Sequence, residues 1–221
     1  MRGQAGDVRL YLVTGPVPPG ADLVDVVADA VGGGVTTVQL RDKDATTDDL
    51  VRLGERLTER IGTRATFVLN DDLQAARALS GAGLHVGPDD LHPARAREAL
   101  GDDAVVGWSL HHVDQLKDEA AVAACSYLAV SPVWPTPTKT DTTAPWGLDG
   151  VRRLRDLVPA DLPLVAIGGI SAANAASVVG AGADGVCVVS AICSSPDPGD
   201  AAHTLREIVD AALAARAEEG R

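Results

Sequence analysis

Short apolar runs alternate with longer amphipathic segments along the whole chain. Each run is rich in β-branched residues and too short for a helix, so each is typical of a buried strand. The eight runs are Leu10–Val13, Thr37–Leu40, Thr66–Leu69, Leu84–Val86, Val105–Trp108, Tyr127–Val130, Leu164–Ile167 and Val186–Val189. Strands that alternate with amphipathic segments in this way indicate repeated βα units.

The segments between the runs carry the signals of helix ends. Thr46 is a candidate cap for a helix that ends near Arg60. Ser171 begins another predicted helix, which runs into Gly180 at a C′-like position. Each apolar run is therefore followed by a candidate helix.

Eight strand–helix units in 221 residues predict an α/β fold, a single (β/α)8 TIM barrel. The alternative is a doubly wound open sheet, which usually has fewer strands and a switch point. No shift in composition marks a second domain. We expect the barrel to span residues 9–214, between a short N-terminal extension at 1–8 and a frayed, charged tail at 215–221.

Composition and charge limit the core and the partners. Apolar residues make up 46% of the chain and aromatic residues only 3%, so Val, Leu, Ile and Ala must form the core. The net charge of -12 disfavours nucleic acid and anionic membranes as partners. The cysteines have no metal-ligand spacing, and no secretory or membrane-spanning segment is recognisable. We therefore expect a cytoplasmic protein; nothing in the sequence indicates its oligomeric state.

In a barrel of this kind, catalytic groups lie at the carboxyl ends of the strands. The second run continues into a polar segment in which Gln39 and Arg41 share one face and Lys43 follows just beyond the edge. An arginine that continues a buried strand would be costly to desolvate without an anion. We therefore interpret Arg41 as an anion-binding residue.

Two pairs of aspartates follow the third and fourth runs. Asp72 lies next to a predicted helix and is the better cap, so Asp71 is the better ligand. One of Asp89 and Asp90 can likewise cap the next helix. Carboxylates from two adjacent loops suit Mg²⁺, which takes one or two protein carboxylates together with waters and phosphate oxygens.

The remaining strand ends offer less reactive chemistry. Ser109 ends the fifth run near two histidines, but no Gly-x-Ser-x-Gly motif surrounds it, which disfavours a hydrolase. His85, on an apolar strand, suits a core role and a catalytic role equally well. After the last two runs, Gly169, Val189 and Ser190 leave backbone N–H groups accessible to a phosphate, as is usual in this fold.

Residues 131–147 form a proline- and threonine-rich stretch that neither a helix nor a central strand can accommodate. The hydroxyls of Thr136 and Thr138 and the ammonium of Lys139 are donors suited to phosphate oxygens. We expect Trp134 and Trp146 to anchor the two ends of this stretch, with ordinary packing as an equally good alternative.

The candidate groups form two sets. Arg41, Lys43 and Lys139, together with Asp71 and Asp90, indicate a site for a metal-bound diphosphate. The glycine and serine positions after the last two runs indicate a separate monophosphate site. These residues alone therefore predict a barrel enzyme that uses Mg²⁺ and two small phosphorylated substrates.

Five segments together resemble the thiamine-phosphate synthase family. They lie in order at the strand ends and extend over nearly the whole chain: Gln39–Lys43, Asn70–Asp72, His85–Asp90, Pro135–Lys139 and Ile167–Ile170. The resemblance implies a transferase that joins 4-amino-2-methyl-5-(diphosphooxymethyl)pyrimidine to 4-methyl-5-(2-phosphooxyethyl)thiazole, giving thiamine phosphate and diphosphate. It also implies that Mg²⁺-bound diphosphate departs first and that the thiazole nitrogen captures the resulting cation.

The resemblance further implies a role for each matching residue. The pyrimidine diphosphate would be held by Gln39, Arg41, Lys43, Asn70, Ser109 and Lys139, of which Arg41, Ser109 and Lys139 would be catalytic. Asp71 and Asp90 would bind Mg²⁺. The thiazole phosphate would be held by Thr136, Thr138, Gly169, Val189 and Ser190. Pro88 and His112 depart from the family pattern.

Three other functions fit the same fold less well. A thiazole tautomerase-like relative would have no need for the diphosphate-binding cations and the two metal-binding aspartates together. A phosphosugar isomerase or epimerase needs a paired acid and base, and only His85 is a candidate. A non-catalytic phosphate-ligand sensor would not need the metal carboxylates.

Overall fold

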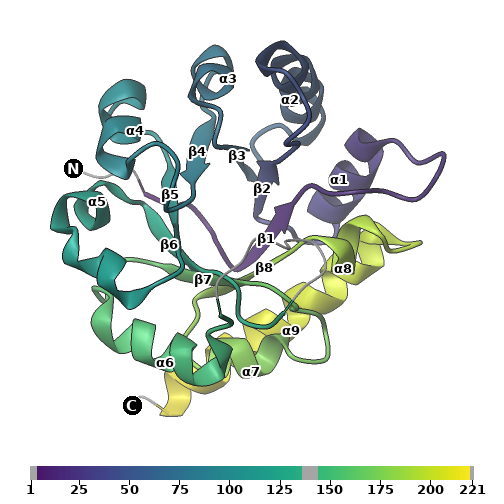
Figure 1. Cartoon of the computed structure of the whole chain (residues 1–221). Coiled ribbons are helices and arrows are strands. Elements are labelled where there is room, and N and C mark those ends of the chain that lie inside the picture. Colours follow the sequence, from purple (N-terminus) through teal and green to yellow (C-terminus); the bar gives the residue numbers. More distant parts are fainter. Residues whose placement is uncertain (1–3, 136–143, 220–221) are drawn as a thin grey trace.

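The computed structural model describes residues 4–135 and 144–219, in which parallel strands form a closed barrel (Figure 1). Each strand pairs with the next one in the sequence, and β8 closes onto β1. The strands are Leu10–Val13 (β1), Thr37–Leu40 (β2), Thr66–Asn70 (β3), Gly83–Val86 (β4), Val106–Leu110 (β5), Tyr127–Val130 (β6), Leu164–Ile167 (β7) and Gly185–Val188 (β8). The predicted TIM barrel is confirmed, and the open sheet is excluded.

Helices surround the barrel (Figure 1). The first six are Leu23–Gly32 (α1), Thr47–Ile61 (α2), Leu73–Ala78 (α3), Pro93–Leu100 (α4), Glu119–Ala124 (α5) and Gly147–Leu157 (α6). The last three are Ala175–Gly180 (α7), Ser190–Cys193 (α8) and Pro198–Glu219 (α9), and a 3-10 helix at Val113–Lys117 precedes α5. Within the described part of the chain, no helix combines the length and the apolar character that a membrane-spanning segment requires.

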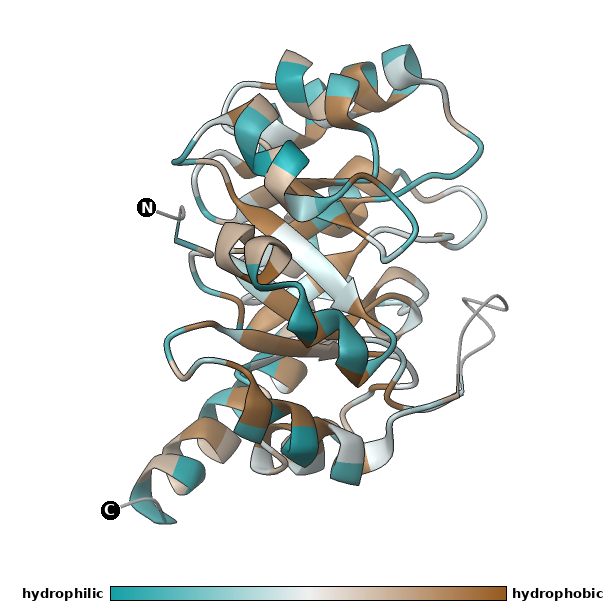
Figure 2. Ribbon diagram, turned by 60° about the vertical axis from the view of Figure 1, so that its left-hand side comes forward, coloured by the Kyte–Doolittle hydropathy of each residue, from teal (hydrophilic) through white to brown (hydrophobic). Residues whose placement is uncertain are grey.

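The apolar residues form two separate cores. The larger one lies between the strands and the helices and is almost entirely aliphatic, as the composition predicts. The smaller one fills the inside of the barrel and includes Tyr11, Tyr127 and Cys187. Figure 2 shows hydrophobic segments in the interior of the protein and many hydrophilic residues along the surrounding helices. The strands are thus buried on both sides, which is why they appear as continuous apolar runs in the sequence.

The helix caps agree with the sequence at two positions. Thr46 caps α2 in a capping box with Asp49, and Asp72 caps α3 by accepting a hydrogen bond from the backbone N–H of Ala75. The cap of α4, however, is His92 rather than either preceding aspartate. The reason is that the carboxylate of Asp90 turns back and accepts a hydrogen bond from the backbone N–H of Gly87 at 2.8 Å.

Helix α7 begins four residues later than the sequence predicts. The side chain of Asn174 accepts a hydrogen bond from the backbone N–H of Ser171 and donates one to the carbonyl of Gly169, both at 2.9 Å. Such local bonds from an asparagine compete with helical hydrogen bonds and favour a turn. Gly180 is the last residue of α7, so it does not occupy the predicted C′ position.

The described end regions of the chain both pack against the barrel. Ala5 and Val8 belong to the inner core, so residues 4–8 cover the N-terminal end of the barrel. Helix α9 continues through residues 215–219, where the sequence predicts a frayed end. Arg216 holds this part of the helix, because its guanidinium donates to the carbonyl of Ala183 and pairs with Asp184, both at 2.7 Å.

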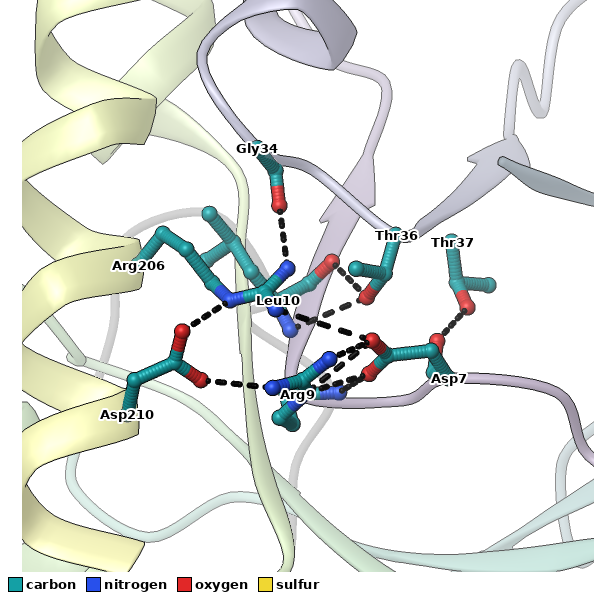
Figure 3. Close-up of polar contacts among 8 residues, drawn as sticks. All are labelled: Asp7, Arg9, Leu10, Gly34, Thr36, Thr37, Arg206 and Asp210. Carbon is teal, nitrogen blue, oxygen red and sulfur yellow. Dashed lines mark hydrogen bonds and ion pairs between the residues drawn. The ribbon is translucent and has the colours of Figure 1, made fainter. Parts of the chain in front are cut away.

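An ion-pair network joins α9 to the chain before β1 (Figure 3). Asp7 accepts hydrogen bonds from the backbone and the guanidinium of Arg9. Arg9 pairs with Asp210 at 3.0 Å, and Asp210 accepts a hydrogen bond from Arg206 at 2.7 Å. Arg206 also donates to the carbonyl of Gly34, so the network connects the last helix to the first two βα units.

Replacement of Asp7 by asparagine is expected to lower the free energy of unfolding by about 1 kcal/mol near neutral pH, since the network is partly exposed. Burial alone would raise the pKa of Asp7, but the hydrogen bonds from Arg9 outweigh it and hold the pKa below its ordinary value of 3.8. A carboxyl with a lowered pKa stabilises the fold above its ordinary pKa and loses that effect as the pH falls through the lowered one. Urea unfolding should therefore show a difference between wild type and variant at about pH 7 that shrinks below about pH 4.

Asp29, exposed on α1, provides the matched control. Asp29→Asn should leave the free energy of unfolding nearly unchanged at either pH. An Asp7→Asn variant as stable as wild type near neutral pH would show that the network does not fasten α9.

Candidate active site

A cavity of about 1180 Å³ opens at the carboxyl ends of the strands. Polar side chains from several strands form its floor and apolar residues such as Val165 and Ile167 form part of its wall. Seven predicted site residues line it: Gln39, Arg41, Lys43, Ser109, Gly169, Val189 and Ser190. The barrel thus brings both predicted phosphate-binding sets to one cavity.

One side of the cavity is the loop after β2, which carries Arg41 and Lys43. The Thr14 hydroxyl accepts a hydrogen bond from the backbone N–H of Arg41 at 2.9 Å and donates one to its carbonyl at 3.2 Å. These bonds fix the backbone of Arg41 against the end of β1, while Lys43 is exposed. Asp42 and Asp44, which the sequence interpretation overlooked, line the same cavity. Two cations and two anions make this loop neutral overall, so anion binding here depends on direct contact rather than long-range attraction.

The opposite side is formed by backbone after β7 and β8. Gly168 and Gly169 adopt positive φ angles of 110° and 67°. A Cβ atom at Gly168 would lie 2.6 Å from the Cβ of Pro132, so only glycine fits there. Val189 and Ser190 follow β8 directly, and Ser190 is exposed to the cavity opening. This glycine-rich edge leaves the backbone accessible, as a phosphate site in this fold requires.

Of the described candidates, Asn70, Asp71 and Asp90 do not line the cavity; they lie at the end of β3 and in the loop after β4. Asp71 has a φ of 63° and is the sole described non-glycine residue with a positive φ. Its backbone N–H donates to the carbonyl of His85 at 2.9 Å, and its carboxylate accepts a hydrogen bond from the Asn70 amide at 2.5 Å. A strained conformation held in this way is characteristic of functional positions.

Asp71 and Asp90 offer oxygen ligands from adjacent loops, a donor set that fits Mg²⁺. Within residues 4–135 and 144–219, no three His, Cys, Asp or Glu side chains gather into a metal-binding group. Two carboxylates alone leave most of an octahedral shell to water and to the substrate's phosphate oxygens, as is usual for Mg²⁺. The described residues are therefore compatible with a metal that arrives with its diphosphate.

Thr136, Thr138 and Lys139 lie outside the described residues, but both flanks of their loop are well defined. The backbone N–H of Trp134 donates to the carbonyl of Gly168 at 3.2 Å. The indole N–H of Trp146 donates to the carbonyl of Leu110 at 3.1 Å. Both rings pack against the outer core. Both tryptophans are therefore held in place at the flanks of the loop, in contacts that fit an anchoring role and ordinary packing equally well.

A buried polar cluster forms the floor of the cavity. The two ring nitrogens of His85 contact the hydroxyl of Tyr127 and the hydroxyl of Ser109, each at 2.9 Å. Tyr127 also contacts Tyr11 at 2.7 Å, and burial raises the pKa of both phenols. The ring nitrogen of His85 that faces away from Ser109 contacts a phenol, whereas in a hydrolytic triad a carboxylate holds this position. The sequence suits His85 to a core role or to a catalytic role. The structure fits both, because His85 is buried and also lines the cavity.

Comparison with known proteins supports the same function. The family model described as thiamine monophosphate synthase matches residues 10–192. The thiamine-phosphate synthase of Albidiferax ferrireducens is 44% identical over 206 residues, which cover 92% of this chain and 93% of that protein. The enzyme of the same name from Geobacillus kaustophilus is 42% identical over 211 residues, 93% of each chain.

A solved structure is also similar to this chain. Thiamine phosphate pyrophosphorylase from Pyrococcus furiosus superposes with a TM-score of 0.82 at 31% identity, over 94% of this chain and 98% of that one. The matches extend over nearly the whole barrel, including every strand end that contributes to the cavity. The chain therefore belongs to the thiamine-monophosphate synthase family.

Proposed function

We propose that the chain joins 4-amino-2-methyl-5-(diphosphooxymethyl)pyrimidine to 4-methyl-5-(2-phosphooxyethyl)thiazole within this one cavity, forming thiamine phosphate and releasing diphosphate. The observation that supports the proposal is that two different groups of residues suited to anions line the same cavity. Arg41 and Lys43 stand at one edge, and the backbone of Gly169, Val189 and Ser190 forms the other. Two phosphorylated substrates could then bind with their reactive atoms between the edges.

The residues around the cavity suit a dissociative reaction. Arg41, Lys43 and Lys139 would hold the diphosphate and stabilise the charge that develops as it departs. Asp71 and Asp90 would hold Mg²⁺, which neutralises part of that charge when bound. Gln39, Asn70 and Ser109 would orient the pyrimidine, and Thr136 and Thr138 with the glycine edge would orient the thiazole. Such a reaction needs alignment and charge stabilisation but no protein nucleophile.

A tautomerase-like activity is less well supported by the same cavity. It would require no diphosphate leaving group, and so no cationic edge opposite the phosphate edge. The presence of Arg41 and Lys43 in the cavity that Ser190 also lines therefore favours the coupling reaction.

The purified protein is expected to form thiamine phosphate and diphosphate when both substrates and Mg²⁺ are supplied. Product formation can be followed by chromatography of the thiamine product and by a coupled diphosphate assay. Omission of either substrate, or chelation of the metal, should abolish product formation. Folded protein that forms no product with all three components would contradict the proposal.

A further inference from the structure

Five buried side chains form an unbroken hydrogen-bonded chain across the inside of the barrel. The Gln39 amide nitrogen donates to the Tyr11 hydroxyl at 2.8 Å, and Tyr11 contacts Tyr127 at 2.7 Å. His85 then connects Tyr127 to Ser109 through contacts of 2.9 Å. None of the five residues is more than 8% exposed. Both ends, Gln39 and Ser109, are residues that we place at the pyrimidine.

The middle of this chain depends on a glycine. His85, Gly107 and Tyr127 lie in one row across β4, β5 and β6. A Cβ atom at Gly107 would lie 2.1 Å from the Cζ atom of Tyr127 and 2.6 Å from the Nδ1 atom of His85. Only a residue without a side chain therefore lets the imidazole and the phenol meet above β5. Glycine weakens a strand, so its presence here marks a place where close approach is required.

The order of donors along this chain follows from counting protons when each hydroxyl group accepts one hydrogen bond within the chain and donates one. Each phenol has one proton, and a neutral imidazole has one N–H group. Gln39 donates to Tyr11, so in such a relay the proton of Tyr11 is directed to Tyr127, and that of Tyr127 to Nδ1 of His85. The imidazole proton then lies on Nε2 and is donated to Ser109. The hydroxyl proton of Ser109 is left for the cavity, and so is the carbonyl oxygen of the Gln39 amide.

The two ends consequently have opposite and coupled polarity: Gln39 presents an acceptor and Ser109 presents a donor. A 4-aminopyrimidine offers the complementary pair, since its amino group donates and its ring nitrogen accepts. A 4-oxopyrimidine reverses both, with an accepting oxygen beside a ring N–H. We propose that Tyr11, Tyr127 and His85 are positioning residues that fix this polarity and so select an aminopyrimidine over its oxo analogue. This inference rests on the proposed function.

The test compares the aminopyrimidine diphosphate with its 4-oxo analogue as substrates, with Tyr127→Phe as the first variant. Wild type should prefer the amino substrate by about 100-fold or more in kcat/KM, because a mismatched site leaves buried polar groups unpaired. Tyr127→Phe interrupts the chain, and the preference should fall by about tenfold or more. The KM for the thiazole phosphate should be unchanged.

Two further variants separate positioning from a merely structural role. Tyr11→Phe should reduce the preference as Tyr127→Phe does, and the double variant should be no worse than either, because each interrupts the same chain. Gly107→Ala should produce the same loss while it retains every hydroxyl group. Ile61→Val, buried in the outer core and away from both the cavity and the chain of hydrogen bonds, is the matched control and should retain the preference.

The tautomer of His85 gives a readout that is independent of activity. Nitrogen-15 NMR of the folded protein should show His85 protonated at Nε2 and unprotonated at Nδ1, with assignment by comparison with His85→Asn. A proton on Nδ1 would reverse the polarity of both ends and overturn the inference. Folded Tyr11→Phe and Tyr127→Phe variants that keep the wild-type preference would also overturn it. If wild type makes no thiamine phosphate from the amino substrate, the proposed function itself fails.

Discussion

Replacement of Asp71 by asparagine is expected to lower turnover by about 100-fold or more while the protein remains folded. The substitution removes the negative charge that we assign to Mg²⁺ but keeps the size of the side chain. Asparagine also tolerates the left-handed backbone at this position, where φ is 63°. The loss should therefore arise from weaker stabilisation of the departing diphosphate rather than from strain. Initial rates across a range of Mg²⁺ concentrations would measure it.

The dependence on metal makes this expectation specific. If Asp71 and Asp90 hold Mg²⁺, Asp71→Asn and Asp90→Asn should both raise the concentration of Mg²⁺ that gives half-maximal rate. Asp90→Asn also replaces the carboxylate that accepts the Gly87 hydrogen bond, but the new amide oxygen can still accept it. Near-normal rates at ordinary Mg²⁺ concentrations in either variant would show that the aspartate is not a metal ligand.

The neighbouring Asp72 provides the matched control. It caps α3 through the backbone N–H of Ala75 at 2.8 Å and accepts a hydrogen bond from the hydroxyl of Thr47 at 2.7 Å. Asp72→Ala should therefore lower the free energy of unfolding by about 1 kcal/mol. Its turnover and its response to Mg²⁺ should remain close to those of wild type. If Asp71→Asn loses turnover but remains stable, while Asp72→Ala loses stability but keeps its turnover, then Asp71 is the metal ligand and Asp72 is the helix cap.

The strand positions could be predicted because a strand that is buried on both faces consists of a continuous run of apolar residues. The predicted edges of β3, β4, β5 and β8 differ from the observed ones by one or two residues, and at the ends of β3 and β5 a polar residue continues the strand. Asn70 extends β3, and Ser109 lies inside β5 instead of ending it. Periodicity shows where an apolar run stops, but backbone pairing with the neighbouring strand decides where a strand ends.

The buried polar cluster could not be predicted in the same way. Tyr11 and Tyr127 each occupy an apolar run, where a single hydroxyl does not alter the pattern. Their contact joins residues 116 positions apart in the chain, a distance at which local patterns carry no signal. The only available hint was that both tyrosines of the chain occur in predicted strands of an otherwise aliphatic core. The cap of α4 was missed for a related reason, because the direction in which Asp90 turns depends on the loop that contains Gly87.

Arg41 is the second position at which a large effect is expected. Its backbone is fixed by Thr14, so a change of side chain leaves the loop in place. Arg41→Ala should lower kcat/KM for the pyrimidine diphosphate by about 100- to 1000-fold, since it removes a donor from the departing charge. Arg41→Lys should recover part of this loss, because it restores the charge but not the paired donors of a guanidinium.

The measurement that decides the role of Arg41 is the dependence of the rate on each substrate in turn. If Arg41 acts on the diphosphate, KM for the thiazole phosphate should be unchanged in both variants. Arg56→Ala removes an exposed arginine that pairs with Asp22 on the outer surface. This variant should leave KM for both substrates unchanged. The loop after β2 is neutral overall, so Arg41 should act through direct contact with the diphosphate. The effect of Arg41 should therefore persist at high ionic strength, where long-range attraction is screened. A higher KM for the thiazole phosphate instead would assign Arg41 to the other half of the cavity and reverse the proposed placement of the two substrates.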